Sequence, residues 1–187
     1  MRKALSQKTK AIFYPLFPSS SPALHAKRRK GMYYRHAGPE VLECQKEQDK
    51  IYWRVFLSDQ KKGNFLEVGG DGVVGSHTLG LELNRGWEGA FCSHEPKLRQ
   101  RAESVRKCET LEKLKEFPQM KKPDLLAVHQ PFMYPDAWDQ VRTNQLNPRW
   151  IIVENRDPDP QWCRLLEGLG YKLKFFFHDD EYYKLKS

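Results

Sequence analysis

Cysteine is scarce in this chain, and long apolar runs are missing. The four cysteines among 187 residues are Cys44, Cys92, Cys108 and Cys163, and no two of them form a CxxC pair. This spacing predicts neither a zinc site nor a disulfide framework, so we expect an intracellular, reducing compartment, either the cytoplasm or an organelle such as the mitochondrion or plastid. Because the apolar runs are only a few residues long, the sequence also predicts no transmembrane segment.

Acidic residues are absent from the first 38 residues, which carry nine basic side chains. The rest of the chain is close to neutral, so the formal charge of +8 comes from this segment. We therefore predict a basic, extended N-terminal tail over residues 1–38 and one domain over residues 39–187. Such a tail suits RNA phosphates or an acidic protein surface, and a solvated or organelle-targeting tail is the alternative.

From residue 39 onward, short apolar runs alternate with stretches of helical periodicity. This alternation predicts an α/β fold with a twisted, mostly parallel sheet and helices on both faces. The last two runs leave no room for a helix between them, which predicts a C-terminal antiparallel hairpin at the sheet edge. The expected strands cover residues 64–68, 89–93, 124–128, 150–154, 171–177 and 181–186, and the expected helices 39–58, 77–83, 97–107, 111–117, 136–142 and 161–169.

Glycines crowd the segment that follows the first expected strand, "FLEVGGDGVVGSHTLG". Residues 70–75 fit the G-x-G-x-x-G pattern of a dinucleotide site, although little chain remains for the second half of such a site. Glu67, inside the strand, favours a different ligand, because a carboxylate beside a tight glycine turn suits the cationic amino group and sulfonium of S-adenosylmethionine. A turn that needs glycine for backbone reasons alone is the third interpretation.

The segment "GNFLEVGGDGVVGSHTLGLELNRGWEGAF" resembles the opening of FkbM-type methyltransferases, with an E-x-G strand end, a D-G turn and a G-W-x-G entry into the next strand. The stretches "KPDLLAVH", "NPRWIIVE" and "LLEGLGYKLKFFFHDDEYYKL" are similar to later parts of the same family. The resemblance covers roughly residues 43 to 186. It implies a Rossmann-like class I methyltransferase fold, with S-adenosylmethionine bound at the carboxyl ends of the strands, and O-methylation of a sugar or other small hydroxyl compound.

By position, the resemblance places Glu67, Gly69, Asp71 and Gly72 in the donor loop, with Ser76 and Thr78 at the start of the following helix. The turn is one residue shorter than in the family. Where the family has an acid that grips the donor ribose, this chain has Ser93, and Glu95 two residues later is the substitute.

After the fourth strand, the family's acidic D-x-E-G-like turn is replaced by His129-Gln130-Pro131-Phe132. A neutral histidine can act as a general base, so His129 is the candidate catalytic residue. Glu154, which ends the fifth strand, is a further site candidate because ligands bind at such strand ends.

Other polar and aromatic residues have structural explanations. Asp157 and Asp159 suit a turn and a helix N-cap rather than a carboxylate pair. The histidines show no metal-ligand spacing, and the sequence predicts no metal site. The five tryptophans are expected in the core or an interface rather than stacked on nucleic-acid bases.

Two functions follow from these patterns. The first is an S-adenosylmethionine-dependent methyltransferase that acts on a small hydroxyl acceptor. The second is a catalytically inactive domain of the same fold, which serves as a subunit of a larger protein or ribonucleoprotein assembly and is anchored by its basic tail. Fold alone does not choose between them.

Overall fold

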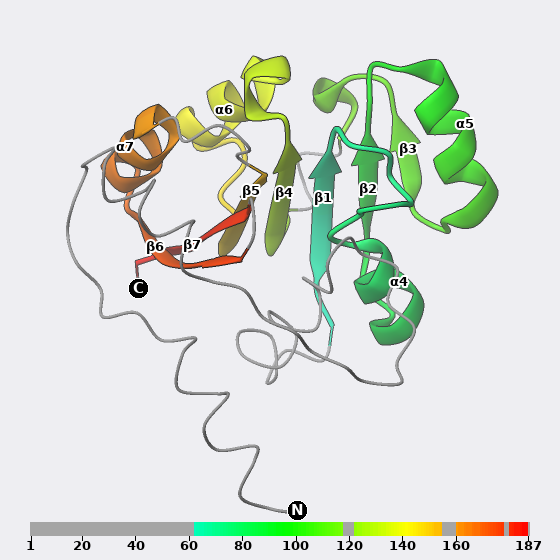
Figure 1. Cartoon of the computed structure of the whole chain (residues 1–187), viewed down its shortest axis with the longest axis horizontal. Helices are drawn as coiled ribbons and strands as arrows, with labels where there is room; N and C mark the ends of the chain where they lie inside the picture. The colour runs from blue at the N-terminus through cyan, green and yellow to red at the C-terminus, as the bar shows by residue number, and fades with distance from the viewer. Residues whose placement is uncertain (1–61, 118–121, 155–159, 178–179, 187) are drawn as a thin grey trace, which may run out of the picture.

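The computed structural model describes residues 62–117, 122–154, 160–177 and 180–186. Within these ranges, seven strands form one sheet in the order β3-β2-β1-β4-β5-β7-β6 (Figure 1). The β5–β7 and β6–β7 pairs are antiparallel, and the other four pairs are parallel. The strands are β1 (Asn64–Val68), β2 (Glu88–Cys92), β3 (Glu109–Leu111), β4 (Leu125–His129), β5 (Trp150–Glu154), β6 (Tyr171–Phe177) and β7 (Asp180–Leu185).

The sheet has its switch point between β1 and β4. From β1 the chain proceeds outward through β2 and β3, and it then returns to place β4 and β5 on the other side of β1. In open α/β sheets, ligands bind outside the carboxyl ends of the strands at such a point. The segments that follow β1, β2, β4 and β5 are therefore the expected positions of ligand-binding residues.

Helices cover both faces of the sheet. One face packs against α6, α7 and the short 3-10 helix η2, through a core that includes Leu66, Val128 and Ile151. The other face, which includes Phe65 and Ile152, packs against Leu81 of α4. The helices are α4 (Leu79–Arg85), α5 (Pro96–Val105), η2 (Leu114–Glu116), η3 (Pro131–Met133), α6 (Pro135–Arg142) and α7 (Pro160–Gly168).

Most predicted elements are confirmed within one or two residues, including the strands 64–68 and 150–154 and the C-terminal hairpin. The helix predicted over residues 111–117 is wrong. Leu111 ends the three-residue strand β3, and η2 follows it. Leu111, Leu114 and Phe117 are all buried, and their spacing of three suits the 3-10 helix as well as an α-helix. A pattern of apolar positions could not separate these alternatives.

Three of the tryptophans, Trp87, Trp138 and Trp150, are buried in the core, as expected.

Several predictions fall outside the described residues. They are the helix over residues 39–58, the tail with its boundary, and the roles of Asp157 and Asp159. Cys92, Cys108 and Cys163 are free thiols. Among the residues that the structure places, no helix has the length and apolar character needed to cross a membrane.

Candidate functional site

The glycine turn, residues 69–75, connects β1 to the segment before α4. Four of its residues, Gly69, Gly70, Gly72 and Gly75, have φ angles between 70° and 78°. A residue with a Cβ atom adopts this left-handed region only at an energetic cost. The glycine-rich sequence therefore has a backbone reason, whatever ligand the turn meets.

Rings of the protein itself occupy the space that the missing side chains leave. A Cβ atom at Gly69 would lie 2.5 Å from the ring of Tyr134, and one at Gly70 would lie 2.8 Å from the ring of His129. A Cβ at Gly72 would meet the Phe91 ring at 2.7 Å. The bare backbone thus lets rings of the protein itself approach the turn closely.

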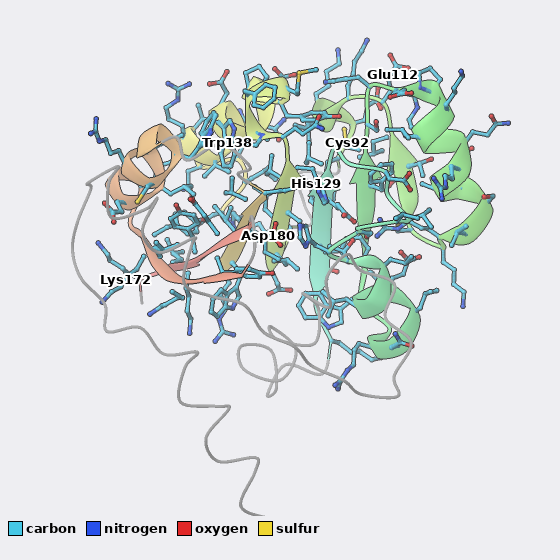
Figure 2. All side chains as sticks on the ribbon, viewed as in Figure 1. Cys92, Glu112, His129, Trp138, Lys172 and Asp180 are labelled. Carbon is cyan, nitrogen blue, oxygen red and sulfur yellow. The ribbon has the colours of Figure 1, made fainter. Side chains whose placement is uncertain are left out.

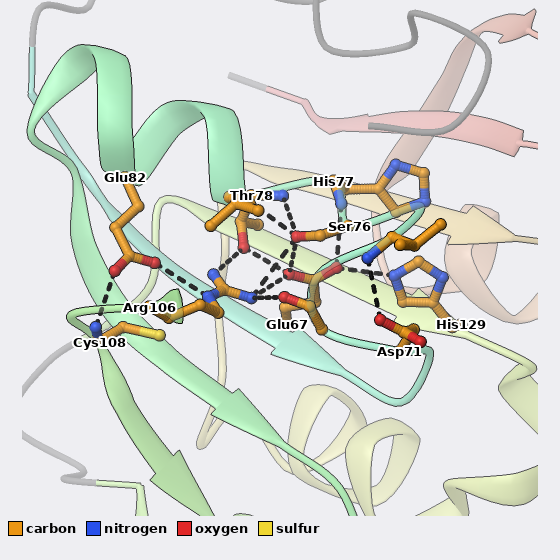
Figure 3. Close-up of polar contacts among 12 residues, drawn as sticks. Glu67, Asp71, Ser76, His77, Thr78, Glu82, Arg106, Cys108 and His129 are labelled. Carbon is orange, nitrogen blue, oxygen red and sulfur yellow. Dashed lines mark hydrogen bonds and ion pairs between the residues drawn. The ribbon is translucent and has the colours of Figure 1, made fainter. Parts of the chain in front are cut away.

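Glu67 in β1 has a fully buried carboxylate that accepts five hydrogen bonds (Figure 3). A carboxylate offers about four lone-pair sites, so this one is saturated. It holds the segment between the glycine turn and α4 in place, which is why α4 begins at Leu79 rather than at residue 77 as predicted. The donors are Ser76 Oγ (2.7 Å), the His77 backbone N–H (2.9 Å), Thr78 Oγ1 (2.5 Å), Arg106 Nη1 (2.8 Å) and His129 Nε2 (2.8 Å).

These contacts keep Glu67 ionised inside the protein. Burial opposes the charge, but the hydrogen bond with His129 and the charge of Arg106 hold the pKa of Glu67 well below its usual value. Because the saturated carboxylate does not line the neighbouring cleft, this geometry does not favour the predicted contact between Glu67 and the donor.

Arg106, the residue after α5, is the buried cation that joins two acids. Its guanidinium donates to Glu67 Oε2 at 2.8 Å and, through Nε, to Glu82 Oε2 at 2.9 Å. It also lies 5.2 Å from the centroid of the Phe65 ring. The remaining Glu82 oxygen accepts the backbone N–H groups of Lys107 and Cys108. Arg106 thereby links α5 and α4 to β1.

His129 lies between two carboxylates. Its Nε2 is 2.8 Å from Glu67 and its Nδ1 is 2.7 Å from Glu154. Burial lowers the pKa of His129, but the hydrogen bonds to Glu154 and Glu67 raise it to about 10. The imidazole is therefore protonated at neutral pH and donates both N–H groups. As placed here, His129 does not have the free lone pair that the predicted general base needs.

His77 stacks on His129 with ring centroids 4.6 Å apart. Burial and the positive charge of His129 lower the pKa of His77 to about 3. One of the two stacked imidazoles is thus charged and the other is neutral. This difference lets two buried histidines pack face to face without like-charge repulsion.

A cleft of about 380 Å³ opens beside this buried cluster, at the carboxyl ends of β1, β2, β4 and β5. Its size lies within the range of small-molecule sites, about 300 to 1,000 Å³. Each of these strands contributes its last residue or the segment that follows it. Among the lining residues are Gly70, Asp71, Ser93, Glu95, Tyr134 and Glu154.

The predicted donor-loop residues have different positions around this cleft. Ser93 and Glu95 line it, and the Glu95 backbone N–H donates to Ser93 Oγ at 3.2 Å. Asp71 also lines the cleft, but its carboxylate accepts the Val74 N–H and pairs with Arg101 Nη1 at 2.6 Å. Asp71 therefore fastens the glycine turn to α5.

Sequence reasoning missed Arg106, Arg101 and Tyr134. Tyr134 stacks on His94 at 5.1 Å and covers Gly69, so it forms one wall of the cleft. These three residues lie 26 to 59 positions beyond Gly75, the last residue of the turn, and no local motif marks them. Glu154 was predicted from its place at a strand end, and the structure puts it at the cleft beside His129.

No protein-family model and no curated protein matches the chain. Several solved structures with a similar fold are named as methyltransferases. A precorrin-6y C5,15-methyltransferase from Geobacter metallireducens GS-15 is 16% identical, with 81% of this chain and 94% of that chain covered and a TM-score of 0.56. A methyltransferase from Pyrococcus furiosus is 14% identical, with coverage of 79% and 85% and a TM-score of 0.53.

An RNA methyltransferase from Salinibacter ruber, solved in complex with S-adenosyl-L-homocysteine, is 14% identical, with coverage of 77% and 92% and a TM-score of 0.50. At such identities the likeness shows the fold. The chain has the Rossmann-like fold of class I, S-adenosylmethionine-dependent methyltransferases, as predicted. The finer FkbM-type assignment stays a prediction.

Proposed function

We propose that the cleft binds S-adenosylmethionine and that the chain transfers its methyl group to a hydroxyl group of a small molecule, as the FkbM-type resemblance implies. The observation that supports this is the position of the cleft at the switch point of the sheet, with the glycine turn on one side and Glu95 on the other. When bound, the donor would supply an electrophilic methyl group.

Glu95 is the residue that would hold the donor ribose. It lines the cleft, its side chain is exposed, and none of the ion pairs among the described residues includes it. A carboxylate without a partner can accept hydrogen bonds from both ribose hydroxyls, and such charge-assisted bonds contribute about 1.5–3 kcal/mol each. Ser93, fully buried beside it, would fix the backbone of this loop.

The acceptor side of the cleft carries apolar side chains. Val74, Phe132 and Met133 are 62%, 68% and 56% exposed, and Val74 and Met133 line the cleft. Gln130 holds a left-handed backbone conformation, with φ of 48°, immediately before η3. Non-glycine residues in this sparsely populated region cluster at active sites and ligand clamps. An acceptor molecule that carries both a hydroxyl group and an apolar group fits this edge of the cleft better than an unsubstituted sugar.

Glu154 is the side chain that would take the hydroxyl proton. It lines the cleft and contacts His129 Nδ1 at 2.7 Å. His129 would orient this carboxylate rather than act as the base itself, because both of its ring nitrogens already face carboxylates.

The second candidate function is a methyltransferase-fold subunit without catalysis, in a protein or ribonucleoprotein assembly. The observation that favours it is the saturation of Glu67 by the protein's own donors, together with the protonated His129. In this case the buried charges would serve the fold alone, and the cleft would be a remnant.

Titration calorimetry of the full chain with S-adenosylmethionine and S-adenosylhomocysteine separates the two functions. We expect both to bind, and the absence of heat at millimolar donor would eliminate the enzyme proposal. Methyl transfer can then be compared between octyl glucoside and methyl glucoside, which carry the same hydroxyl groups. Equal rates of methyl transfer to the two glucosides would contradict the preference for an acceptor with an apolar group.

Replacing the ribose-binding carboxylate gives a sharper test. We expect Glu95→Gln to weaken donor binding by about tenfold to a hundredfold, because one charge-assisted acceptor is lost. Glu88→Gln is the matched control, since Glu88 is an exposed acid at the opposite end of β2. Equal donor affinity of the two variants in calorimetry would show that Glu95 does not contact the donor.

A further inference from the structure

Five basic residues lie in the region where β6 and β7 meet the start of β5. We call Arg149, Lys172, Lys174, Lys184 and Lys186 the hairpin cations. Lys172 lies directly opposite Lys184 in the antiparallel β6–β7 register. The Leu185 N–H donates to the Arg149 carbonyl, which brings Arg149 to the end of β7 beside Lys186. In Figure 2, Lys172 projects from the side of the hairpin away from α7.

The hairpin cations have no acidic partner among the residues that the structure describes. Among the residues that the structure describes, none of the ion pairs within 4.0 Å includes any of the five. Two arginines on the other side of the molecule are different: Arg99 pairs with Glu112, and Arg101 pairs with Asp71. The hairpin therefore presents a concentrated positive charge that no acid in the described part of the chain neutralises.

This arrangement works against the stability of the hairpin. Like charges directly opposite each other across two antiparallel strands repel at a Cβ separation of about 4.5–5.5 Å. The repulsion extends to Lys174, whose pKa is lowered first by burial and then by the charges of Lys172 and Lys184. A pair of opposite charges at these positions would have been more stable.

Protection of an exposed sheet edge explains only part of the pattern. β6 is the edge strand, and lysines on an edge discourage pairing with other chains. That role accounts for Lys172 and Lys174. It does not account for Lys184, because β7 is already paired on both sides, with β5 and β6.

The geometry favours phosphates over bases or peptide carboxylates as the ligand. Lys184 Nζ lies 5.2 Å from the centroid of the Trp150 ring, and Trp150 is 5% exposed, so a base cannot stack there. One face of an extended acidic peptide offers a charge about every 7 Å. Every nucleotide of a nucleic-acid strand carries a phosphate charge, and its rotatable backbone can turn successive phosphates toward the same group of cations.

We propose that the hairpin cations bind the phosphate backbone of single-stranded nucleic acid without reading its sequence. The site lies at the amino end of β5, whereas Glu154 at its carboxyl end lines the cleft. Phosphate binding at the hairpin is therefore independent of donor binding, and a bound strand leaves the cleft open. The nine basic residues of the first 38 add to the same attraction.

The test is fluorescence anisotropy of the full chain with labelled oligouridylate and oligothymidylate of about 20 nucleotides, between about 50 and 200 mM salt. The variant combines Lys172→Gln, Lys174→Gln and Lys184→Gln. The control combines Lys97→Gln, Lys107→Gln and Lys115→Gln, which removes the same charge from exposed positions around α5 and η2. A thermal melt checks folding, and the hairpin variant is expected to be at least as stable as the wild type.

We expect the hairpin variant to bind both oligonucleotides about tenfold to a hundredfold more weakly than the control. Its slope of log K against log salt should be smaller by about 2, at about 0.7 for each lost phosphate contact. Preference for one oligonucleotide identifies RNA or DNA as the source of the phosphates. Equal slopes for the two variants would assign all binding to the tail and overturn the proposal, and so would tighter binding of polyglutamate than of either oligonucleotide.

Discussion

The charges behind the glycine turn and the charges of the hairpin are handled in opposite ways. Glu67, Arg106 and His129 are buried, and their polar atoms meet partners of the opposite charge. Lys172 and Lys184 lie at the surface, opposite each other, and none of the described acids pairs with either. The charges of the buried cluster stabilise the fold, whereas the charges of the hairpin remain accessible to the solvent and to a ligand.

The difference follows from solvation. A buried charge that loses its partner costs several kcal/mol, so the interior cluster must be complete to exist at all. Exposed lysines are solvated and screened by salt, so a repulsive pair costs only tenths of a kcal/mol and can be retained for binding. Stability measurements should therefore report on the buried cluster, and binding measurements should report on the hairpin.

The largest effect on stability is expected from Arg106→Met. The substitution keeps much of the side-chain volume but leaves Glu67 and Glu82 without their shared cation, at a cost of about 3–5 kcal/mol. Urea denaturation measures the free energy of unfolding. Arg101→Met is the control, because the Arg101–Asp71 pair is half-exposed and should contribute at most about 1 kcal/mol. Similar losses in the two variants would contradict the contrast between buried and exposed pairs.

His129 should make stability depend on pH in the alkaline range. Its pKa rises from 6.5 in the unfolded chain to about 10 in the fold. Between these values the folded state holds a proton that the unfolded state has released, so the contribution of His129 is complete below pH 6.5 and is lost as the pH rises toward 10. The loss is on the order of a few kcal/mol.

Urea denaturation across this range, with His129→Gln as the comparison, isolates the effect. The variant should be less stable near neutral pH, and its free energy of unfolding should decline less than that of the wild type as the pH rises. Parallel pH curves would mean that His129 is not protonated in the fold. The pKa of His77 is lowered to about 3, so its contribution to the free energy of unfolding has the opposite pH dependence. This contribution is present above pH 6.5 and is lost as the pH falls from 6.5 toward 3.

A smaller effect separates packing around the turn from backbone strain. Gly70 and Gly86 both have positive φ, 70° and 63°. A Cβ at Gly70 meets the His129 ring at 2.8 Å, whereas a Cβ at Gly86 meets nothing within 4 Å. Gly70→Ala should therefore cost about 1–3 kcal/mol more than Gly86→Ala in urea denaturation, because it also displaces His129. Equal costs would show that backbone conformation alone requires glycine at both positions.

The sequence predicted the parts of this site that depend on short-range order. The strand ends and the need for glycine after β1 follow from local patterns, and the family resemblance pointed to Ser93 and Glu95, which line the cleft. It did not predict what surrounds Glu67. The acid was identified beside the turn, but its partners Arg106 and His129 lie 39 and 62 residues away, and periodicity carries no information on such contacts.

The amino-acid sequence by itself determined most of the strands and helices and their order, because the burial of apolar runs and the φ > 0 of glycine are local properties of the chain. Only the tertiary structure decided the state of the charged groups. Whether Glu67 faces a ligand or an internal arginine, and whether His129 is a base or an imidazolium, depends on which distant charges the sheet brings within hydrogen-bonding distance. The same holds for Lys172 and Lys184, which the register of a hairpin placed opposite each other.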